Sequence, residues 1–261
     1  MFAIIKNTFR EAIAKKIFII SYSFFSLFIL LITLALNLDA LEAMMQLLNI
    51  NEAVVAAQTL MTSFFPFVFA MLICIVTAAS FIPSMVSKGN IDLILSKPLS
   101  RFKILFSKYT GGVLFIFISF TFLIGLVWLV LSAKFGVWNF KFLITIVSWT
   151  ISFAIIYSFV LFIGLITESA VVSILAGIFL CIFSMILSIK EAIFTFVTNG
   201  TSQFIINFFY YIVPKPLQVN AINSQIFSSQ TVESWEPLIT SLLFCIVIIS
   251  YSVYYFSRKD Y

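Results

Sequence analysis

Residues 87–108, SKGNIDLILSKPLSRFKILFSK, form a basic segment between two long apolar runs. It carries five of the fifteen Lys and Arg residues in a chain that is 62% hydrophobic. Cations gathered beside a bilayer are typical of its cytoplasmic side. Gly89, Pro98 and Ser100 each restrict or redirect the backbone in a different way. Their order predicts a folded element between the two apolar runs.

The composition indicates a membrane protein. Only 10% of the residues are charged, against about 25% in soluble domains, and the mean hydropathy is +1.18. The net charge of +5 comes from cations at the ends of apolar runs, where they face anionic lipid headgroups. This pattern predicts contact with membrane lipid and excludes nucleic acid as a partner.

The chain lacks the residue patterns of an enzyme. It contains no His and only three Cys, all inside apolar runs, where Cys behaves as a small hydrophobic residue. It has no phosphate-binding loop, no G-x-S-x-G, no H-E-x-x-H and no C-x-x-C. We therefore expect no catalytic, cofactor or metal site in this chain, and any active transport would draw energy from another subunit.

Six apolar runs are near the roughly 20 residues that a transmembrane helix needs. They predict an all-α protein with a single transmembrane domain over residues 1–261. The expected spans are residues 17–36, 60–81, 104–131, 142–166, 171–189 and 238–256.

The distribution of cations orients these spans. With both termini in the cytoplasm, eleven Lys and Arg residues lie inside and four outside, namely Lys134, Lys141, Lys190 and Lys215. The longest outside segment is residues 190–237, in which the aromatic run 203–213 suits an interfacial or re-entrant element. A seventh span at 192–214 is the alternative, and it would place Arg258 and Lys259 outside.

Residues 1–16 are expected to form an amphipathic helix on the cytoplasmic surface. Its predicted apolar arc holds Phe2, Ile5, Phe9, Ala12 and Ile13, and its polar arc holds Lys6, Asn7, Arg10, Glu11 and Lys15. The alternative is a charged flank that only anchors the first span.

Residues 83–103 are expected to form the cytoplasmic loop after the second span. Pro98 disfavours helix at Lys97, and Ser100 can cap a new helix that begins at Arg101 and continues as the third span. A short helix, a turn and a re-entry would form a rigid knob that transmits force to a soluble partner. A basic loop that only sets topology is the alternative.

This segment resembles the signature loop of type-2 ATP-binding-cassette (ABC) transporter permeases. Asn90 stands where that family usually has Thr, and Ser87 and Lys88 stand where an acidic residue is common, which leaves Asp92 as the only acid nearby. The branch that it most resembles is that of multi-copper-enzyme-maturation permeases, partly through Phe209–Pro214, FYYIVP. The matching residues of the loop are Gly89, Leu93, Leu95, Ser96, Pro98, Leu99, Ser100, Arg101 and Lys108.

The resemblance implies the membrane-spanning subunit of an exporter-type ABC complex in a bacterial plasma membrane. Two permease subunits, identical or not, would stand on two ATPase subunits, which bind ATP and Mg²⁺. Pro98 and Gly89 would shape the docking loop, Arg101 and Lys97 would offer hydrogen-bond donors, and Ile91 and Leu95 would fill a groove on the ATPase. The other implied docking residues are Asn90, Asp92 and Ser100, with Glu168 as a second, smaller contact.

Two other functions stay open from the sequence. An ion-coupled carrier or channel would have to use the polar cluster of the fourth span, made of Thr145, Ser148, Ser152 and Tyr157. A scaffold that recruits a soluble partner without transport would need the same loop. The substrate and the direction of transport are not encoded in any motif of the chain.

Overall fold

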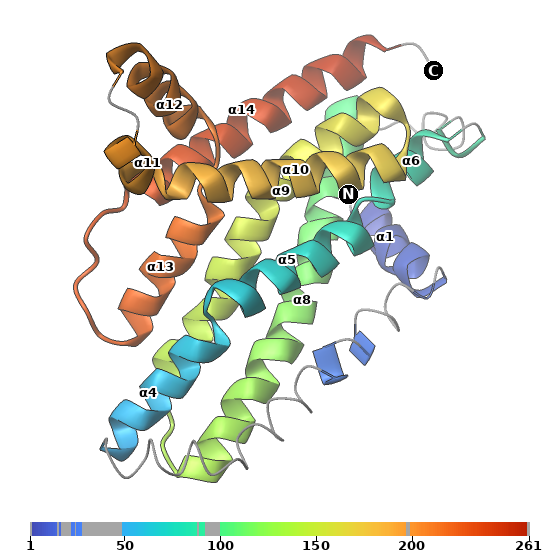
Figure 1. The fold of residues 1–261 in the computed structure, drawn as a ribbon. Coiled ribbons are helices and arrows are strands. Elements are labelled where there is room, and N and C mark those ends of the chain that lie inside the picture. The colour runs from blue at the N-terminus through green and yellow to red at the C-terminus, as the bar shows by residue number, and fades with distance from the viewer. Residues whose placement is uncertain are drawn as a thin grey trace.

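The computed structural model describes residues 2–14, 16, 22–23, 25–27, 49–87, 89–91, 100–196 and 199–259. Regular secondary structure in this part of the chain is helical throughout (Figure 1). The helices are α1 (Phe2–Ala14), α4 (Ile50–Met61), α5 (Phe64–Ala78), α6 (Phe81–Val86), α8 (Arg101–Phe135), the 3₁₀ helix η1 (Phe140–Leu143), α9 (Ile144–Thr167), α10 (Ala170–Ser188), α11 (Lys190–Phe196), α12 (Gly200–Ile212), α13 (Pro216–Phe227) and α14 (Glu236–Arg258). Most of the predicted first span, residues 17–36, lies outside the described residues.

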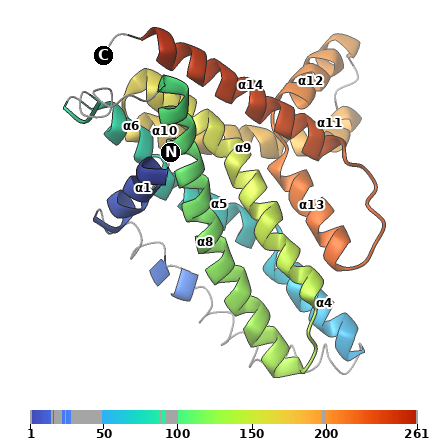
Figure 2. The same ribbon diagram turned by 180° about the vertical axis from the view of Figure 1, so that it is seen from behind.

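Helix α9 is the centre of the bundle. It runs beside α8 in the opposite direction and also packs against α5, α6, α10, α13 and α14 (Figures 1 and 2). The Trp149 ring on α9 makes edge-on contacts with Phe67 of α5 and Phe120 of α8, at centroid distances of 5.4 and 5.5 Å. Such aromatic contacts add to the burial of the rings, so they fix three helices around one side chain.

A second close contact joins α8 and α9 nearer their other ends. Gly112 of α8 faces the Tyr157 ring, and a Cβ atom at residue 112 would lie 2.7 Å from it. The ring of Tyr157 also stacks on Tyr109, with centroids 5.7 Å apart. The absence of a side chain at Gly112 is therefore what lets the two helices approach at this level.

Five described helical segments are long and apolar enough to cross a membrane, so the protein is an all-helical, multi-pass membrane protein. Four of them coincide with predicted spans to within a few residues. The five segments are Phe65–Val86, Arg101–Phe135, Phe140–Thr167, Ala170–Ser188 and Glu236–Arg258.

The second span differs from the predicted one, residues 60–81, at both ends. It begins later because α4 ends at Met61, where the Thr62 hydroxyl donates to the Gln58 carbonyl at 3.0 Å and the chain turns. It ends later because Pro83 lies in the first turn of α6, where a missing N–H group costs no helical hydrogen bond. Residues 83–86 of the predicted loop 83–103 are therefore helical, and so are Arg101–Lys103 of α8.

The predicted outside segment, residues 190–237, contains three helices. Among the described residues, Asn199 is extended and caps the start of α12, so α11 and α12 are not parts of one continuous helix over 192–214; each is shorter than the roughly 20 residues that a span needs. The aromatic run 203–213 belongs almost entirely to α12.

The third of these helices, α13, packs into the bundle through asparagine side chains. The Trp149 Nε1 donates to the Asn220 Oδ1 at 2.8 Å, and the Asn220 Nδ2 donates to the Thr62 carbonyl at 2.7 Å. The Asn223 Nδ2 donates to the Thr145 Oγ1 at 3.1 Å. Asn220 thus joins α9 to the break between α4 and α5. Thr145, which belongs to the predicted polar cluster, bonds α9 to α13.

Candidate functional site

Several helix ends gather at one end of the bundle, which we call the basic end. It consists of α1, the end of α6 with residues 87–91, the first two turns of α8, the α9–α10 turn at residues 167–169 and the end of α14 at residues 256–259 (Figures 1 and 2). All five described candidate spans have one end in this group. The basic end brings together Glu168 and the described parts of the segment that the sequence singled out, residues 87, 89–91 and 100–108.

The chain leaves α6 in a tight turn. Gly89 has a φ of +86°, a value that L-residues with a side chain rarely adopt. The backbone N–H groups of Asn90 and Ile91 both donate to the Ser87 carbonyl, at 3.1 and 3.2 Å. The predicted shaping role of Gly89 therefore has a conformational basis.

Asn90 and Ile91 are both held by the chain's own contacts. The Asn90 side-chain amide donates to the carbonyl of Ser84 at 3.0 Å and so caps the end of α6, while Asn90 itself stays exposed. Ile91 is only 4% exposed and belongs to the hydrophobic core. The expectation that Ile91 fills a groove on a partner is corrected accordingly, because its side chain is buried here.

Four other predicted docking residues lie outside the described residues. They are Asp92, Leu95, Lys97 and Pro98.

Ser100 caps α8, as predicted. Its Oγ accepts a hydrogen bond from the Lys103 backbone N–H at 3.4 Å, with Ser100 in an extended conformation. This is the geometry of an N-cap, which satisfies one of the free N–H groups of a first turn.

The sequence predicts that Arg101 donates hydrogen bonds to a partner protein. In the structure its guanidinium donates to carbonyls of this chain. Its Nη1 donates to the carbonyls of Phe256, Ser257 and Lys259, at 2.9, 3.2 and 2.6 Å. The last carbonyls of a helix have no partner within the helix, and a cation near them interacts favourably with the helix dipole. Arg101 thus ties the start of α8 to the end of α14.

Glu168 is tied to the same end of α14. It ends α9 in a left-handed conformation with a φ of +53°, and its carboxylate lies 2.6 Å from the Lys259 Nζ. The Lys259 Nζ also donates to the Leu165 carbonyl at 3.3 Å. The next residue, Ser169, caps α10 through a hydrogen bond from the Val172 N–H. Glu168 is about half exposed, so part of its carboxylate faces outward.

The N-terminal helix α1 is packed onto α8. A Cβ atom at residue 111 would lie 2.9 Å from the Thr8 Oγ1, so Gly111 makes room for Thr8. Thr8 and Ala12 are fully buried, while Ile13 is 62% exposed.

The residues of the predicted apolar arc have different surroundings. Ile5 and Phe9 are half-buried, and Phe9 meets Phe115 of α8 edge-on. Ile13 is exposed, and so is Arg10 of the predicted polar arc, because the small side chains on the other side of α1 fit closest to α8. The side chain of Phe2 lies outside the described residues.

A buried ion pair that the sequence analysis missed joins α1 to α8. The Lys108 Nζ lies 2.6 Å from the Glu11 Oε2, with Lys108 only 3% exposed and Glu11 16%. The Ser84 hydroxyl of α6 donates to the other Glu11 oxygen. One signal could have found this pair: Lys108 is the only charge within the six predicted spans, and Glu11 is the only acid before Asp39. A charge inside a membrane helix is expected to have a partner.

These contacts connect both flanks of the 87–100 segment to the rest of the basic end. Helix α6, before the segment, bonds to α1 through Ser84. Helix α8, after the segment, bonds to α1 through Lys108 and to α14 through Arg101. A force on residues 87–100 would therefore act on four helices at once.

Comparison with known families agrees with this architecture. The model of a family described as ABC-2 family transporter protein matches residues 2–261, nearly the whole chain. No curated protein matches the sequence. The match does not distinguish branches, so the branch suggested by Phe209–Pro214 stays a prediction. The chain belongs to the ABC-2 transporter family and is a membrane permease subunit of an ABC transporter.

Proposed function

We propose that this permease is driven by ATP hydrolysis in separate ATPase subunits that dock on its basic end, and that it works as an exporter. The observation that carries the proposal is the set of ties made by Arg101, Glu11 and Lys259 around residues 87–100. These hydrogen bonds and ion pairs suit a docking surface through which an ATPase moves the permease, because a displacement of residues 87–100 would move the helices bonded to their flanks. A loop that only sets topology needs none of them.

The proposed contact surface lies around residues 87–100 and the α9–α10 turn. Asn90 and Lys103 are exposed at its two edges, and Glu168 is half exposed beside it. The residues that we propose to meet the ATPase from the centre of the loop are Asp92, Leu95, Lys97 and Pro98. Arg101 would act by holding α14 in place and not by direct contact.

The proposed assembly contains two permease subunits and two ATPase subunits. ATP and Mg²⁺ would bind to the ATPases, and closure of these around nucleotide would push on both basic ends. The proposed location is the bacterial plasma membrane, with the basic end in the cytoplasm. Eleven of the fifteen cations lie on the cytoplasmic side in this orientation.

Site-specific photo-cross-linking in the native host tests this proposal. A photoreactive residue at Asn90 or Lys103 is expected to cross-link to a soluble protein that carries a phosphate-binding loop. The matched controls are Thr59 of α4 and Gln230, three residues after α13, which are also exposed; α4 lies at the end of the bundle opposite the basic end (Figure 1). Equal cross-linking of the ATPase from both ends, or from neither end in a strain that makes the ATPase, would contradict docking at the basic end.

A further inference from the structure

Helix α1 turns a basic side away from the bundle. Its opposite side, which includes Thr8, is fully buried against α8. Lys6 and Arg10 are four residues apart on the exposed side, so their side chains are neighbours on the helix surface. We call the exposed side the basic stripe, and its residues are Lys6, Asn7, Arg10, Ile13 and Ala14.

No described acid of the chain balances the charge of the basic stripe. Glu11 is the only acid of α1, and its carboxylate is turned to the Lys108 Nζ at 2.6 Å, where it is 16% exposed. Among the described residues, Lys6 and Arg10 take part in no ion pair. An anion from outside the chain would therefore meet two adjacent cations and no competing carboxylate of the described structure.

The position of α1 along α8 coincides with the start of the apolar part of that helix. Helix α1 meets α8 at Lys108 and Gly111, and Figures 1 and 2 show it beside the part of α8 nearest the basic end. Residues 113–131 of α8 are uncharged, which is close to the length that crosses a hydrocarbon core. Leu114 and Ile118, early in this stretch, are 43% and 46% exposed. In a bilayer, α1 would therefore lie at the level of the headgroups.

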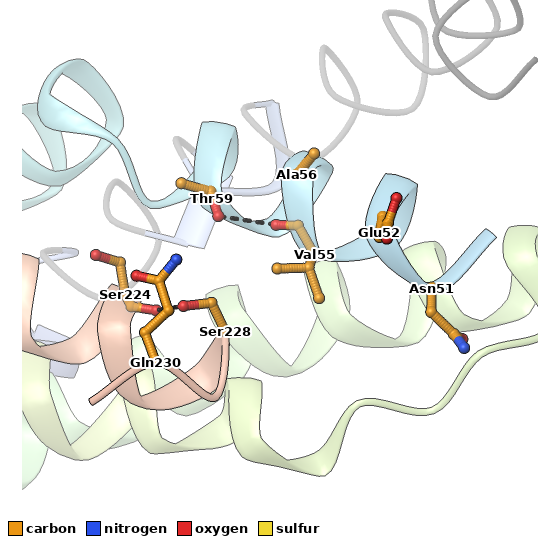
Figure 3. Close-up of a pocket in the computed structure, with 8 residues that line it drawn as sticks. All are labelled: Asn51, Glu52, Val55, Ala56, Thr59, Ser224, Ser228 and Gln230. Carbon is orange, nitrogen blue, oxygen red and sulfur yellow. Dashed lines mark hydrogen bonds between the residues drawn. The ribbon is translucent and has the colours of Figure 1, made fainter. Parts of the chain in front are cut away.

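An anionic phospholipid complements the basic stripe. A lipid phosphate accepts hydrogen bonds from a guanidinium in a bidentate manner and attracts an ammonium as a point charge. The Ile13 side chain is 62% exposed and would lie against the acyl chains, as apolar side chains of interfacial helices do. The recess between α4 and the end of α13, shown in Figure 3, offers no such match, because its lining contains the carboxylate of Glu52 and no Lys or Arg.

We propose that the basic stripe of α1 binds the phosphate headgroup of an anionic phospholipid in the cytoplasmic leaflet. The Arg10 guanidinium and the Lys6 ammonium would share the phosphate, with Ile13 against the acyl chains. The lipid would hold the outward side of α1, while the pair of Glu11 and Lys108 holds its inward side. The choice of leaflet rests on the proposed orientation with the basic end in the cytoplasm, where anionic lipids give the surface its negative potential.

Fluorescence quenching at one position of the full chain in nanodiscs tests this proposal. The three cysteines of the chain are buried, so Asn7→Cys supplies one exposed thiol for a fluorophore within the basic stripe. Phosphatidylcholine nanodiscs receive a small, equal fraction of spin-labelled phosphatidylglycerol or of spin-labelled phosphatidylcholine. At low ionic strength we expect the phosphatidylglycerol to quench about tenfold more strongly or more, since each cation near an anionic lipid adds to binding. High salt should reduce this preference by screening.

Two charge-matched double variants separate the basic stripe from the net charge of the chain. Lys6→Gln with Arg10→Gln should reduce the preference for phosphatidylglycerol at least about fivefold. Lys134→Gln with Lys141→Gln removes the same charge from exposed residues in the last turn of α8 and in η1, and it should leave the preference unchanged. Lys6→Arg keeps the charge and should keep the preference.

Two results would overturn the proposal. The first is equal quenching by the two lipids, which would leave the basic stripe to an acidic surface of a soluble partner. The second is a preference for phosphatidylglycerol that is unchanged in Lys6→Gln with Arg10→Gln. The nanodiscs contain no ATPase and no defined cytoplasmic side, so a failure of the proposed docking or orientation would not alter either result.

Discussion

Among single residues, the Glu11–Lys108 pair is the contact whose disruption should cost the most. Lys108→Met leaves the Glu11 carboxylate half-buried without its ammonium partner at 2.6 Å. Removing one member of a buried ion pair typically costs about 3–5 kcal/mol. We expect a loss of free energy of unfolding in this range, measured by chemical denaturation of the purified protein.

The double variant Glu11→Gln, Lys108→Met is the control for that prediction. It removes both charges, so it should recover part of the lost stability. If Lys108→Met is as stable as the wild type, or if the double variant loses the sum of both single effects, the pair does not join α1 to α8 as described.

Arg101 gives a second prediction at the same scale. Arg101→Gln removes the charged donor to the carbonyls of Phe256, Ser257 and Lys259. A hydrogen bond to a charged group contributes about 1.5–3 kcal/mol, so the last turn of α14 should exchange its amide hydrogens about tenfold faster or more. Hydrogen–deuterium exchange of the C-terminal peptide measures this. Lys103→Gln, two residues on and exposed, is the matched control, and equal exchange rates in both variants would refute the capping role.

Single residues also show where sequence reasoning succeeds and where it does not. The cap at Ser100 was predictable, because a cap depends on neighbours in the chain and here accepts from Lys103. The partners of Arg101 and Lys108 could not be predicted from the sequence, because they lie about 155 and 97 residues away along the chain. Side-chain type alone showed that these cations need acceptors; only the packing shows which acceptors they find.

At the scale of elements, α13 depends on one asparagine. Asn220→Leu keeps the size of the side chain but leaves the Trp149 Nε1 and the Thr62 carbonyl without this partner. Each buried polar group that loses its partner costs about 1–3 kcal/mol. We expect a clear loss of thermal stability and a changed Trp fluorescence spectrum. Gln225→Leu is the control, since Gln225 lies on the same helix and its side chain makes no hydrogen bond to the described residues; it should change neither property. Equal effects of both substitutions would contradict the role of Asn220.

Elements differ in how well the sequence predicts them. Helices α8, α9, α10 and α14 follow directly from apolar runs of about 20 residues. Helices α4 and α13 were not predicted, because each has twelve residues and contains several polar ones. They are held by tertiary contacts: the Gln58 Oε1 of α4 accepts from the Asn139 Nδ2 at 2.8 Å, and Asn220 of α13 bonds to Trp149 and Thr62. Short helices generally depend on such packing.

At the scale of the whole molecule, Lys215 makes stability depend on pH. Lys215 lies between α12 and α13, is 2% exposed, and its ammonium is 3.8 Å from the centre of the Tyr210 ring. Burial lowers the pKa of Lys215 from its ordinary value of 10.5; Glu236 opposes this shift, and Lys190 adds to it. Between the lowered pKa and 10.5 the unfolded chain binds more protons than the folded one, so this residue's contribution to stability rises with pH.

The difference between wild type and Lys215→Met isolates this contribution. We expect the melting temperature of the wild type, relative to Lys215→Met, to rise as the pH is raised from about 8 to about 10.5. Thermal unfolding in one detergent across this range measures it. If the melting temperature of the wild type relative to Lys215→Met is constant or falls with pH, the pKa of Lys215 is not lowered in the folded protein.

We propose that a separate ATPase drives this permease through its basic end. The most direct test is to purify the tagged chain from its native membrane in mild detergent and to identify the proteins that accompany it. We expect a soluble protein with a phosphate-binding loop in equal amount, which is lost when residues 92–99 are replaced by a Gly/Ser linker. A pure chain without an ATPase, from a preparation that keeps another ABC complex intact, would rule out this coupling.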